Sequence, residues 1–329
     1  MIGVTGGAGF IGSALVWALN RAGEDRILIV DDLKSGSKWR NINGLKFIDI
    51  VGKDKFIQDV ESNHSLGLET VFHMGACSST IETDGSYLLH NNYEYSKSLA
   101  TYCLKNKVRF IYASSAATYG SGEHGYDDTC KLRALRPLNI YGYSKHLFDL
   151  WIERIGGLEQ AVGIKFFNVW GPNEAHKGTM RSVVVKAYEQ IKARGVVELF
   201  QSHHPKFENG KQMRDFLYVK DAVRMILEIY RRQNIHGIYN LGQGHSMSWI
   251  ELVTPIFEVL GLEPRIDFIP IPLEIRDQYQ YFTQAAMKRY CLTGCPQYKT
   301  PLKESINDYV INYLEGDFRL GSHIDQPCN

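Results

Sequence analysis

The amino-acid sequence predicts an α/β fold, a doubly wound parallel sheet with a smaller α/β domain beside it. Along the first half of the 329-residue chain, short apolar runs alternate with stretches of helical periodicity. The runs are almost continuous in Val, Ile and Phe, which is typical of strands covered by helices on both faces. A glycine-rich turn joins the first run to the first helical stretch. Together these observations indicate parallel strands connected by helical crossovers.

The first strand is expected to begin at Met1 or Ile2 and to enter a turn that contains Gly6, Gly9 and Gly12. Apolar residues after this turn repeat with the spacing of an amphipathic helix. A second apolar run then ends on an acidic pair. Strand, glycine turn, helix, strand and acid thus follow one another within about thirty residues, the length of a nucleotide-binding βαβ unit.

This order of elements predicts a Rossmann-type cradle for a dinucleotide. Glycines let the backbone approach a pyrophosphate, the helix amino terminus offers it N–H groups, and the acid reaches the adenosine ribose. Asp31 and Asp32 supply that acid. The alternative is an ordinary glycine turn, and the surrounding strands and helix argue against it.

The remaining elements follow in the same alternation. Strands are expected over residues 46–50, 69–73, 108–113 and 163–168, the last of which should close the sheet, and helices over 86–105 and 141–155. Beyond residue 171 the pieces become shorter. There we expect a polar loop (203–212), a helix with Asp221 as its N-cap, a strand (237–242), a helix (248–260), a strand (265–269) and a closing helix (302–314).

The pattern divides the chain into two domains. Residues 1–167 are expected to form the NAD(P)-binding Rossmann domain, with 212–240 returning to it. Residues 168–211 and 241–329 are expected to form the smaller domain, which binds the substrate.

Composition limits the class of protein. The chain has 44% hydrophobic and 22% charged residues and a net charge of +1, so it has no strong basic field for nucleic acid. Its apolar runs fall short of the roughly 20 residues that span a bilayer. The early first strand leaves no room for a signal peptide. The six cysteines lack framework or metal-site spacing, so we expect reduced thiols, no metal and a cytoplasmic protein.

A second motif places Tyr141 and Lys145 four residues apart, on one face of a helix. A tyrosine is a poor base because its reference pKa is about 10. A lysine ammonium and an oxidised nicotinamide would favour the phenolate, and lowering the pKa to about 7 requires roughly 4 kcal/mol. Tyr143 lies on the other face. The alternative is an exposed Tyr–Lys pair without function.

Ser115 completes a possible catalytic set. It lies at the carboxyl end of the expected strand 108–113, where ligands bind in open α/β sheets. Its hydroxyl can hydrogen-bond the reacting oxygen beside Tyr141. A serine-rich strand end is by itself usually a turn, but here it accompanies the dinucleotide cradle and the Tyr–Lys pair.

The glycine turn, Ser115, Tyr141 and Lys145 together resemble the extended short-chain dehydrogenase/reductases, most of which act on nucleotide-diphosphate sugars. Two further segments, 168–172 and 214–221, match that family. The strings at 75–80, 91–97, 112–120, 176–178 and 279–285 resemble more specifically the ADP-L-glycero-D-manno-heptose 6-epimerase subfamily. The resemblance runs from Met1 to about Leu314.

The resemblance implies inversion at C6 of the heptose in ADP-D-glycero-D-manno-heptose, for lipopolysaccharide core synthesis. Bound NADP would oxidise the sugar to a ketone and return the hydride to the opposite face. Tyr141 would be one base and Lys177, in His176-Lys177-Gly178, the second. Burial near Lys145 or the nicotinamide would deprotonate Lys177; alternatively, Lys177 anchors a phosphate or the cofactor. The family also implies a homo-oligomer, specifically a homopentamer.

The residues expected to bind the cofactor are Gly6, Gly9, Phe10, Ile11, Gly12, Asp31, Asp32, Lys38, Lys53, Met74, Gly75, Ala76, Cys77, Ser78, Asn91, Tyr141, Lys145, Val169 and Lys177. Those expected to bind the substrate are Ser115, Asn168, Thr179, Lys186, Phe200, Gln201, Ser202, His203, Arg214 and Tyr279. Of these, Arg214 also suits a diphosphate on chemical grounds, because a guanidinium binds it bidentately. His73 and His176 are expected to be structural.

Some residues bear on the choice of cofactor or depart from the family pattern. The choice of cofactor has evidence on both sides. The carboxylates of Asp31 and Asp32 would repel the 2′-phosphate of NADP and so favour NAD, whereas four basic residues could offset them: Lys34, Lys38, Arg40 and Lys53. We expect NADP. Lys165 replaces the arginine usual in the family, an exchange that we interpret as structural. The alternative functions are a UDP-hexose 4-epimerase and a catalytically silent dinucleotide-sensing protein. A 4,6-dehydratase is disfavoured because Ala116 and Ala117 replace its acid pair.

Overall fold

The computed structural model describes residues 1–276 and 279–322. A seven-stranded sheet in the order β10-β6-β5-β4-β1-β2-β3 lies at its centre, and every pairing in it is parallel. Its strands are β1 (Ile2–Thr5), β2 (Ile27–Asp31), β3 (Asp49–Gly52), β4 (Thr70–His73), β5 (Arg109–Ser115), β6 (Ala161–Phe166) and β10 (Gly237–Leu241). The predicted doubly wound α/β sheet is confirmed.

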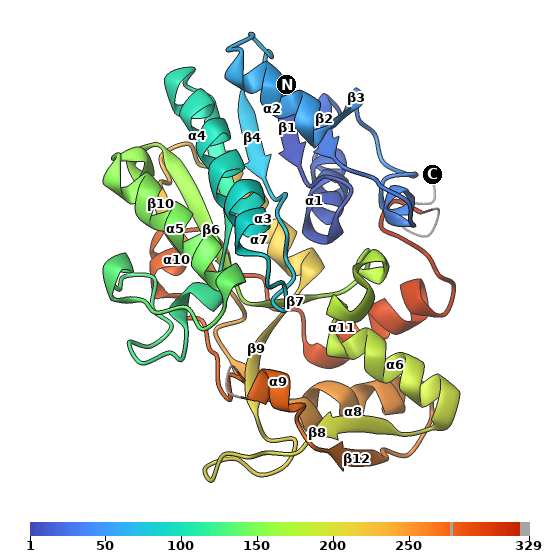
Figure 1. Cartoon of the computed structure of the whole chain (residues 1–329). Helices are drawn as coiled ribbons and strands as arrows, with labels where there is room; N and C mark the ends of the chain where they lie inside the picture. The colour runs from blue at the N-terminus through green and yellow to red at the C-terminus, as the bar shows by residue number, and fades with distance from the viewer. Residues whose placement is uncertain (277–278, 323–329) are drawn as a thin grey trace.

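Helices cover both faces of this sheet (Figure 1). Helices α1 (Phe10–Arg21) and α7 (Val219–Arg231) pack together on one face, where Leu15, Leu19 and Ile226 belong to one hydrophobic cluster. Helices α2 (Lys53–Glu61), α4 (Tyr95–Lys105) and α5 (Ile140–Arg154) supply Phe56, Leu99 and Phe148 to a second cluster. Because both faces are covered, most of the strand residues are apolar, although buried polar side chains such as Arg109 and Lys165 also occur in the strands.

Smaller sheets lie beyond the carboxyl ends of these strands, in the lower part of Figure 1. One contains β7 (Asn168–Trp170), β9 (Met213–Tyr218) and β11 (Ser246–Ser248), and the other β8 (Val197–Phe200) and β12 (Ile266–Ile269). Helices α6 (Val183–Arg194) and α11 (Leu302–Tyr309) contact α8 (Trp249–Val259). Shorter helices are α3 (Gly85–Leu88), α9 (Leu273–Arg276) and α10 (Lys288–Leu292). The division into two domains stays a prediction, and its last residues, 323–329, lie outside the described part.

Several predicted boundaries are wrong. The strand expected over 163–168 does not close the sheet, because β10 pairs with its outer edge. The strand expected from residue 46 begins at Asp49, and helix α2 follows it directly without having been predicted. The helix expected over 86–105 consists of α3, a π-helical segment (Leu89–Glu94) and α4. Helix α6 and strand β8 were also missed.

Asp221 is not an N-cap. Residues 214–218 belong to strand β9, which β7 and β11 flank, and α7 begins one turn earlier than expected, at Val219. Asp221 lies in the first turn of α7, where its carboxylate accepts hydrogen bonds from the backbone N–H (2.7 Å) and hydroxyl (2.8 Å) of Thr300. The apolar residues before it form a buried strand because the two neighbouring strands satisfy their backbone groups.

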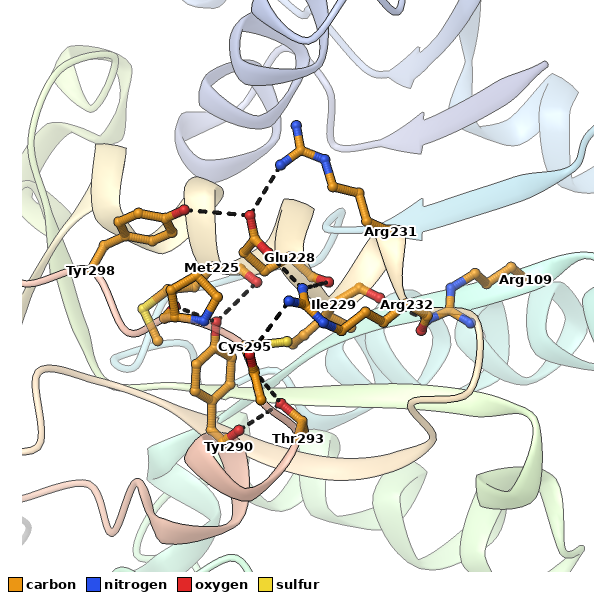
Figure 2. Close-up of polar contacts among 12 residues, drawn as sticks. Arg109, Met225, Glu228, Ile229, Arg231, Arg232, Tyr290, Thr293, Cys295 and Tyr298 are labelled. Atoms are coloured by element: carbon orange, nitrogen blue, oxygen red, sulfur yellow. Dashed lines mark hydrogen bonds and ion pairs between the residues drawn. The ribbon is translucent and has the colours of Figure 1, made fainter.

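Charged side chains gather where α7 ends, at the amino end of the central sheet (Figure 2). Arg109, the first residue of β5, donates to the backbone carbonyls of Ile229, Arg232 and Gln233 at 2.9–3.0 Å, where α7 ends. A cation at this position satisfies terminal carbonyls and opposes the negative end of the helix dipole. Nearby, Glu228 accepts from Arg232 (2.5 Å) and Arg231 (3.0 Å).

Two other features of the described residues concern membrane-spanning helices and cysteines. In residues 1–276 and 279–322, no helix is long and apolar enough to cross a membrane. The five cysteines within that part are free thiols, whereas Cys328 lies outside it.

Candidate active site

A cavity of about 870 Å³ opens at the carboxyl ends of the central strands. The catalytic residues expected from the sequence, Ser115, Tyr141, Lys145 and Lys177, all line it. Every residue expected to bind the cofactor lines it as well. Besides Tyr141, Lys145 and Lys177, these are Gly6, Gly9, Phe10, Ile11, Gly12, Asp31, Asp32, Lys38, Lys53, Met74, Gly75, Ala76, Cys77, Ser78, Asn91 and Val169. Segments far apart in sequence therefore meet at one site.

The glycine turn between β1 and α1 leaves room only for backbone. Gly6 has a φ of +65°, and a Cβ there would lie 2.6 Å from the Cα of Gly75. A Cβ on Gly12 would lie 2.0 Å from the carbonyl oxygen of Gly6. Gly9, at the N-cap of α1, has no side chain to satisfy the first N–H groups of the helix. The turn thus fits the pyrophosphate of a dinucleotide, which those N–H groups can bind.

Asp31, at the end of β2, is held between backbone and a lysine. Its carboxylate accepts from the N–H of Ala8 (2.9 Å) and from Nζ of Lys38 (2.7 Å), and Lys38 also donates to the carbonyl of Asp32 (3.1 Å). Lys53 donates to Asn91 (3.1 Å) at the same cavity. Arg40 instead pairs with Asp317 (2.6 Å). The charge of Asp31 is therefore compensated at the place where the adenosine ribose would lie.

Helix α5 places Tyr141 and Lys145 against the end of β5. Its N-cap, Asn139, accepts from the N–H of Gly142, which fixes the first turn. Lys145 donates to the carbonyl of Ala113 (2.8 Å) and is buried, and burial lowers its pKa to about 8. Lys145 therefore stays mostly protonated at pH 7 but loses its proton at a lower pH than an ordinary lysine does.

The protein side chains by themselves do not lower the pKa of Tyr141. Burial raises the pKa of its phenol, and a hydrogen bond with Ser115 only partly opposes this effect. Lys145 donates to a backbone carbonyl instead and is not among the groups that shift Tyr141. Because the protein side chains leave this pKa raised, the expected phenolate depends on the second of the two expected cations, an oxidised nicotinamide.

Lys177 lies across the cavity in a 3-10 helix (Ala175–Met180), with Nζ 5.2 Å from the ring centre of Phe10. Burial lowers its pKa, the carboxylate of Glu174 raises it, and the ammonium of Lys186 lowers it. The like-charged neighbour is therefore Lys186, on α6, and not Lys145 as we expected. Both effects that lower the pKa favour the neutral amine, which is the form that a base requires.

Glu174 fixes the segment that carries Lys177. Its carboxylate is buried and accepts hydrogen bonds from the hydroxyl of Ser182 (2.7 Å), the N–H of Gly171 (3.2 Å) and the hydroxyl of Tyr309 (3.2 Å). Asn41 reaches the same segment, with Nδ2 3.1 Å from Nδ1 of His176. These contacts hold the loop against the segment Lys38–Asn41 and against α11, so Lys177 has a defined position.

The residues expected to bind the substrate divide into two groups. Ser115 and Asn168 line the cavity. Thr179, Lys186, Phe200, Gln201, Ser202, His203, Arg214 and Tyr279 do not line it in this structure. Arg214 is buried between the rings of Trp249 and Tyr279, whose centres lie 5.8 and 5.2 Å from its guanidinium carbon.

Trp249 connects these two groups, and sequence reasoning missed it. Its ring lines the cavity, and its indole N–H donates to the hydroxyl of Tyr279 (3.0 Å). Trp249 follows Ser248, which forms a capping box with Glu251 and so fixes the start of α8. A helix was expected from residue 248, as the structure has it, but nothing local shows that the first helical residue faces a cavity.

Other cavity residues were also not predicted, among them Tyr87, Trp170, Arg181 and Phe216. Tyr87 lies on α3, and Trp170 and Phe216 lie on β7 and β9, within two separate segments that match the family, so no single motif joins them. The buried ring of His73 contacts the hydroxyls of Thr5 (2.7 Å) and Ser96 (2.8 Å). It thereby ties β4 to β1, and burial lowers its pKa to about 3.

Comparison with known proteins agrees with this site. Residues 2–242 match the NAD dependent epimerase/dehydratase family. The chain is 48% identical to an ADP-L-glycero-D-manno-heptose-6-epimerase of Nitratidesulfovibrio vulgaris, covering 94% of this chain and 97% of the relative. It is 42% identical to the protein of that name from Fusobacterium nucleatum, covering 95% and 98%.

Among solved structures, the Helicobacter pylori ADP-L-glycero-D-manno-heptose-6-epimerase superimposes with a TM-score of 0.79 and 26% identity over 94% of this chain and 95% of that one. The chain therefore belongs to the NAD dependent epimerase/dehydratase family of extended short-chain dehydrogenase/reductases, and within it to the ADP-L-glycero-D-manno-heptose-6-epimerases.

Proposed function

We propose that this protein converts ADP-D-glycero-D-manno-heptose to ADP-L-glycero-D-manno-heptose by inversion at C6, for lipopolysaccharide core synthesis. The observation that carries the proposal is that Ser115, Tyr141, Lys145 and Lys177 line one cavity with the glycine cradle. The names of relatives at 42% and 48% identity give the substrate.

The roles of the residues follow from their positions. Tyr141 takes the proton of the C6 hydroxyl and returns it, with Ser115 hydrogen-bonded to the same oxygen. Lys177 acts as acid and base toward the opposite orientation of the sugar, since it lies on a different segment from Tyr141. The glycine turn and Asp31 would hold the dinucleotide, whose oxidised nicotinamide would supply acceptance and return of the C6 hydride, so the reaction would have no net redox change.

We propose NADP as the cofactor, with NAD as the alternative. Lys38 supports NADP because its ammonium pairs with Asp31 and thereby cancels the charge that would repel a 2′-phosphate. Lys34 and Lys53 add positive charge at the same cavity. The family description, which names NAD, supports the alternative.

The remaining parts of the proposal concern the rest of the chain. Segments 168–211 and 241–329 form the nucleotide-sugar-binding part, and Arg214, from the segment 212–240 between them, binds the diphosphate. The protein is a cytoplasmic homo-oligomer, a homopentamer if it follows the resemblance. The position of Arg214, one aromatic ring behind the cavity, supports its role.

The experiment is incubation of the purified protein with ADP-D-glycero-D-manno-heptose, without added cofactor, and chromatographic resolution of the two C6 epimers. We expect growth of the L-glycero epimer to an equilibrium mixture. No conversion even with added NADP⁺ or NAD⁺, together with turnover of UDP-galactose, would favour the 4-epimerase. Cofactor binding without turnover of either sugar would favour a sensing protein.

A further inference from the structure

A buried ion pair lies directly behind the catalytic side chains. Nζ of Lys165, on β6, is 2.8 Å from Oδ2 of Asp149, on α5, and both side chains are at most 1% exposed. Asp149 is four residues after Lys145, so the two side chains share a helix face one turn apart. The ammonium and carboxylate at this depth are stable only because each meets several polar partners.

Asp149 fastens α5 to strand β5. Its Oδ2 also accepts from the hydroxyl of Ser114 (2.7 Å), and its Oδ1 accepts from the hydroxyl of Tyr112 (3.0 Å). Lys145 contacts Ala113, the residue between Tyr112 and Ser114, by donating to its carbonyl. Three consecutive contacts, at 112, 113 and 114, thus fix the register of the helix against the strand that ends in Ser115.

Lys165 reaches the Ser115 segment from the other side. Its Nζ donates to the hydroxyl of Thr118, and that hydroxyl donates to the carbonyl of Ser115 (2.8 Å). The same ammonium lies 5.0 Å from the ring centre of Tyr119. The ion pair therefore contacts Ser114 directly and the carbonyl of Ser115 through Thr118. Neither Asp149 nor Lys165 lines the cavity itself.

We propose that the Asp149–Lys165 ion pair is a positioning element of the active site, which holds Ser115, Tyr141 and Lys145 in register and supplies the negative charge that faces Lys145. The sequence analysis concerns only Lys165, which it interprets as a structural exchange for the usual arginine, and does not predict its pairing with Asp149. The kinetic part of this inference rests on the proposed function; the electrostatic part does not.

The groups that face Lys145 come from three elements. Asp149 and Tyr141 lie on its own helix, Cys77 lies on the loop after β4, and His73 lies on β4 itself. Asp149 raises the pKa of Lys145 more than Cys77 does, and burial opposes both. His73 is neutral near pH 7, since its own pKa is about 3. Loss of the Asp149 charge should therefore lower the pKa of Lys145.

The test compares the double variant D149N/K165M, which replaces the ion pair by neutral groups of similar shape, with K165R, which keeps both charges. The pKa of Lys145 is measured by NMR of protein with ¹³C-labelled lysine side chains, the signal being assigned by its absence in K145R. We expect the pKa of Lys145 to fall by about one unit in D149N/K165M and to stay near the wild-type value in K165R. D149N alone should show the same fall if the double variant does not fold.

A matched control removes the Glu228–Arg232 pair at the other end of the sheet (Figure 2). The variant E228Q/R232M should leave the titration of Lys145 unchanged, because this pair contacts the end of α7. In the kinetic arm, the rate of epimerisation should decline at a pH about one unit lower in D149N/K165M, with kcat affected more than KM.

An unchanged Lys145 titration in folded D149N/K165M or folded D149N would overturn the proposal and leave a purely structural pair. If ADP-heptose is not the substrate, the kinetic arm gives no signal but the NMR titration still reports on Lys145. Failure of the proposed function and failure of this inference are thus distinguishable.

Discussion

The two ends of the central sheet use charged residues in opposite ways. At the amino end, the guanidinium of Arg109 meets the last carbonyls of α7, and Glu228 meets two arginines, so polar groups satisfy one another. At the carboxyl end, Tyr141, Lys145 and Lys177 border a cavity, and burial shifts the pKa of each away from its ordinary value. The first arrangement stabilises the fold, and the second has the properties of a site for chemistry.

This difference follows from the direction of parallel strands. All seven strands end on the same side. The glycine turn follows β1, Ser115 is the last residue of β5, and the Lys177 segment follows β7, the short strand after β6. The helices return toward the amino end, where their carboxyl-terminal carbonyls need donors. Substitutions at the carboxyl end should therefore change turnover, whereas substitutions at the amino end should change stability.

The largest effect is expected for Tyr141→Phe. Removing the hydroxyl deletes the proton transfer at C6, so kcat should fall on the order of 10³-fold, with thermal stability close to wild type. Epimer interconversion and thermal melting measure the two properties. Tyr143→Phe, two residues away and half exposed, is the matched control and should keep its activity. Equal losses in both variants would contradict the assignment of Tyr141.

Arg109→Met tests the amino end. The substitution leaves buried carbonyls of α7 without a donor, so the free energy of unfolding should fall by about 3 kcal/mol, measured by urea denaturation. The kcat of the folded protein should not change. Arg231→Met, at an exposed arginine of the same cluster, should cost less than about 1 kcal/mol. A loss of turnover in folded Arg109→Met would break the comparison between the ends.

The variant Lys177→Arg distinguishes the two roles considered for Lys177, a catalytic base and an anchor for a phosphate or the cofactor. Arginine keeps the positive charge but cannot act as a base near neutral pH, so kcat should fall on the order of 10²-fold. In the wild type, activity should decline as the pH falls through the pKa of Lys177, because protonation removes the base. That pKa is lowered by burial and by Lys186. Activity retained in Lys177→Arg would assign Lys177 to phosphate or cofactor binding instead.

Lys38→Met is expected to have the smallest effect. It removes the ammonium beside Asp31 and should reduce the preference for NADP over NAD by about tenfold, or 1.4 kcal/mol. The dissociation constants of both cofactors, measured by fluorescence titration of cofactor-free protein, give this ratio. Lys34→Met serves as the control for position and should reduce the preference less, since the exposed ammonium of Lys34 lies 4.0 Å from the carboxylate of Asp32. A larger change in that control would move the 2′-phosphate site to Lys34.

The sequence predicted best where function and local pattern coincide. Gly6, Gly9 and Gly12 form one turn, and Tyr141 and Lys145 share one helical turn, so short spacings were enough to place them at the carboxyl end. The contacts of Arg109 with α7 and of Asp149 with Lys165 join residues 16 to 124 positions apart, which no periodicity reveals. Asp221 shows a related limit, because its helical pattern began inside a strand that two distant strands complete.

The account depends most on hydride transfer at C6 within the carboxyl-end cavity. The direct measurement uses ADP-D-glycero-D-manno-heptose that carries deuterium at C6 and mass spectrometry of the epimer formed in ordinary water. We predict that the L-glycero product retains the deuterium at C6, because the hydride leaves and returns without contact with solvent. A product that has lost the deuterium to water, or the absence of any C6 epimer, would contradict the proposed reaction.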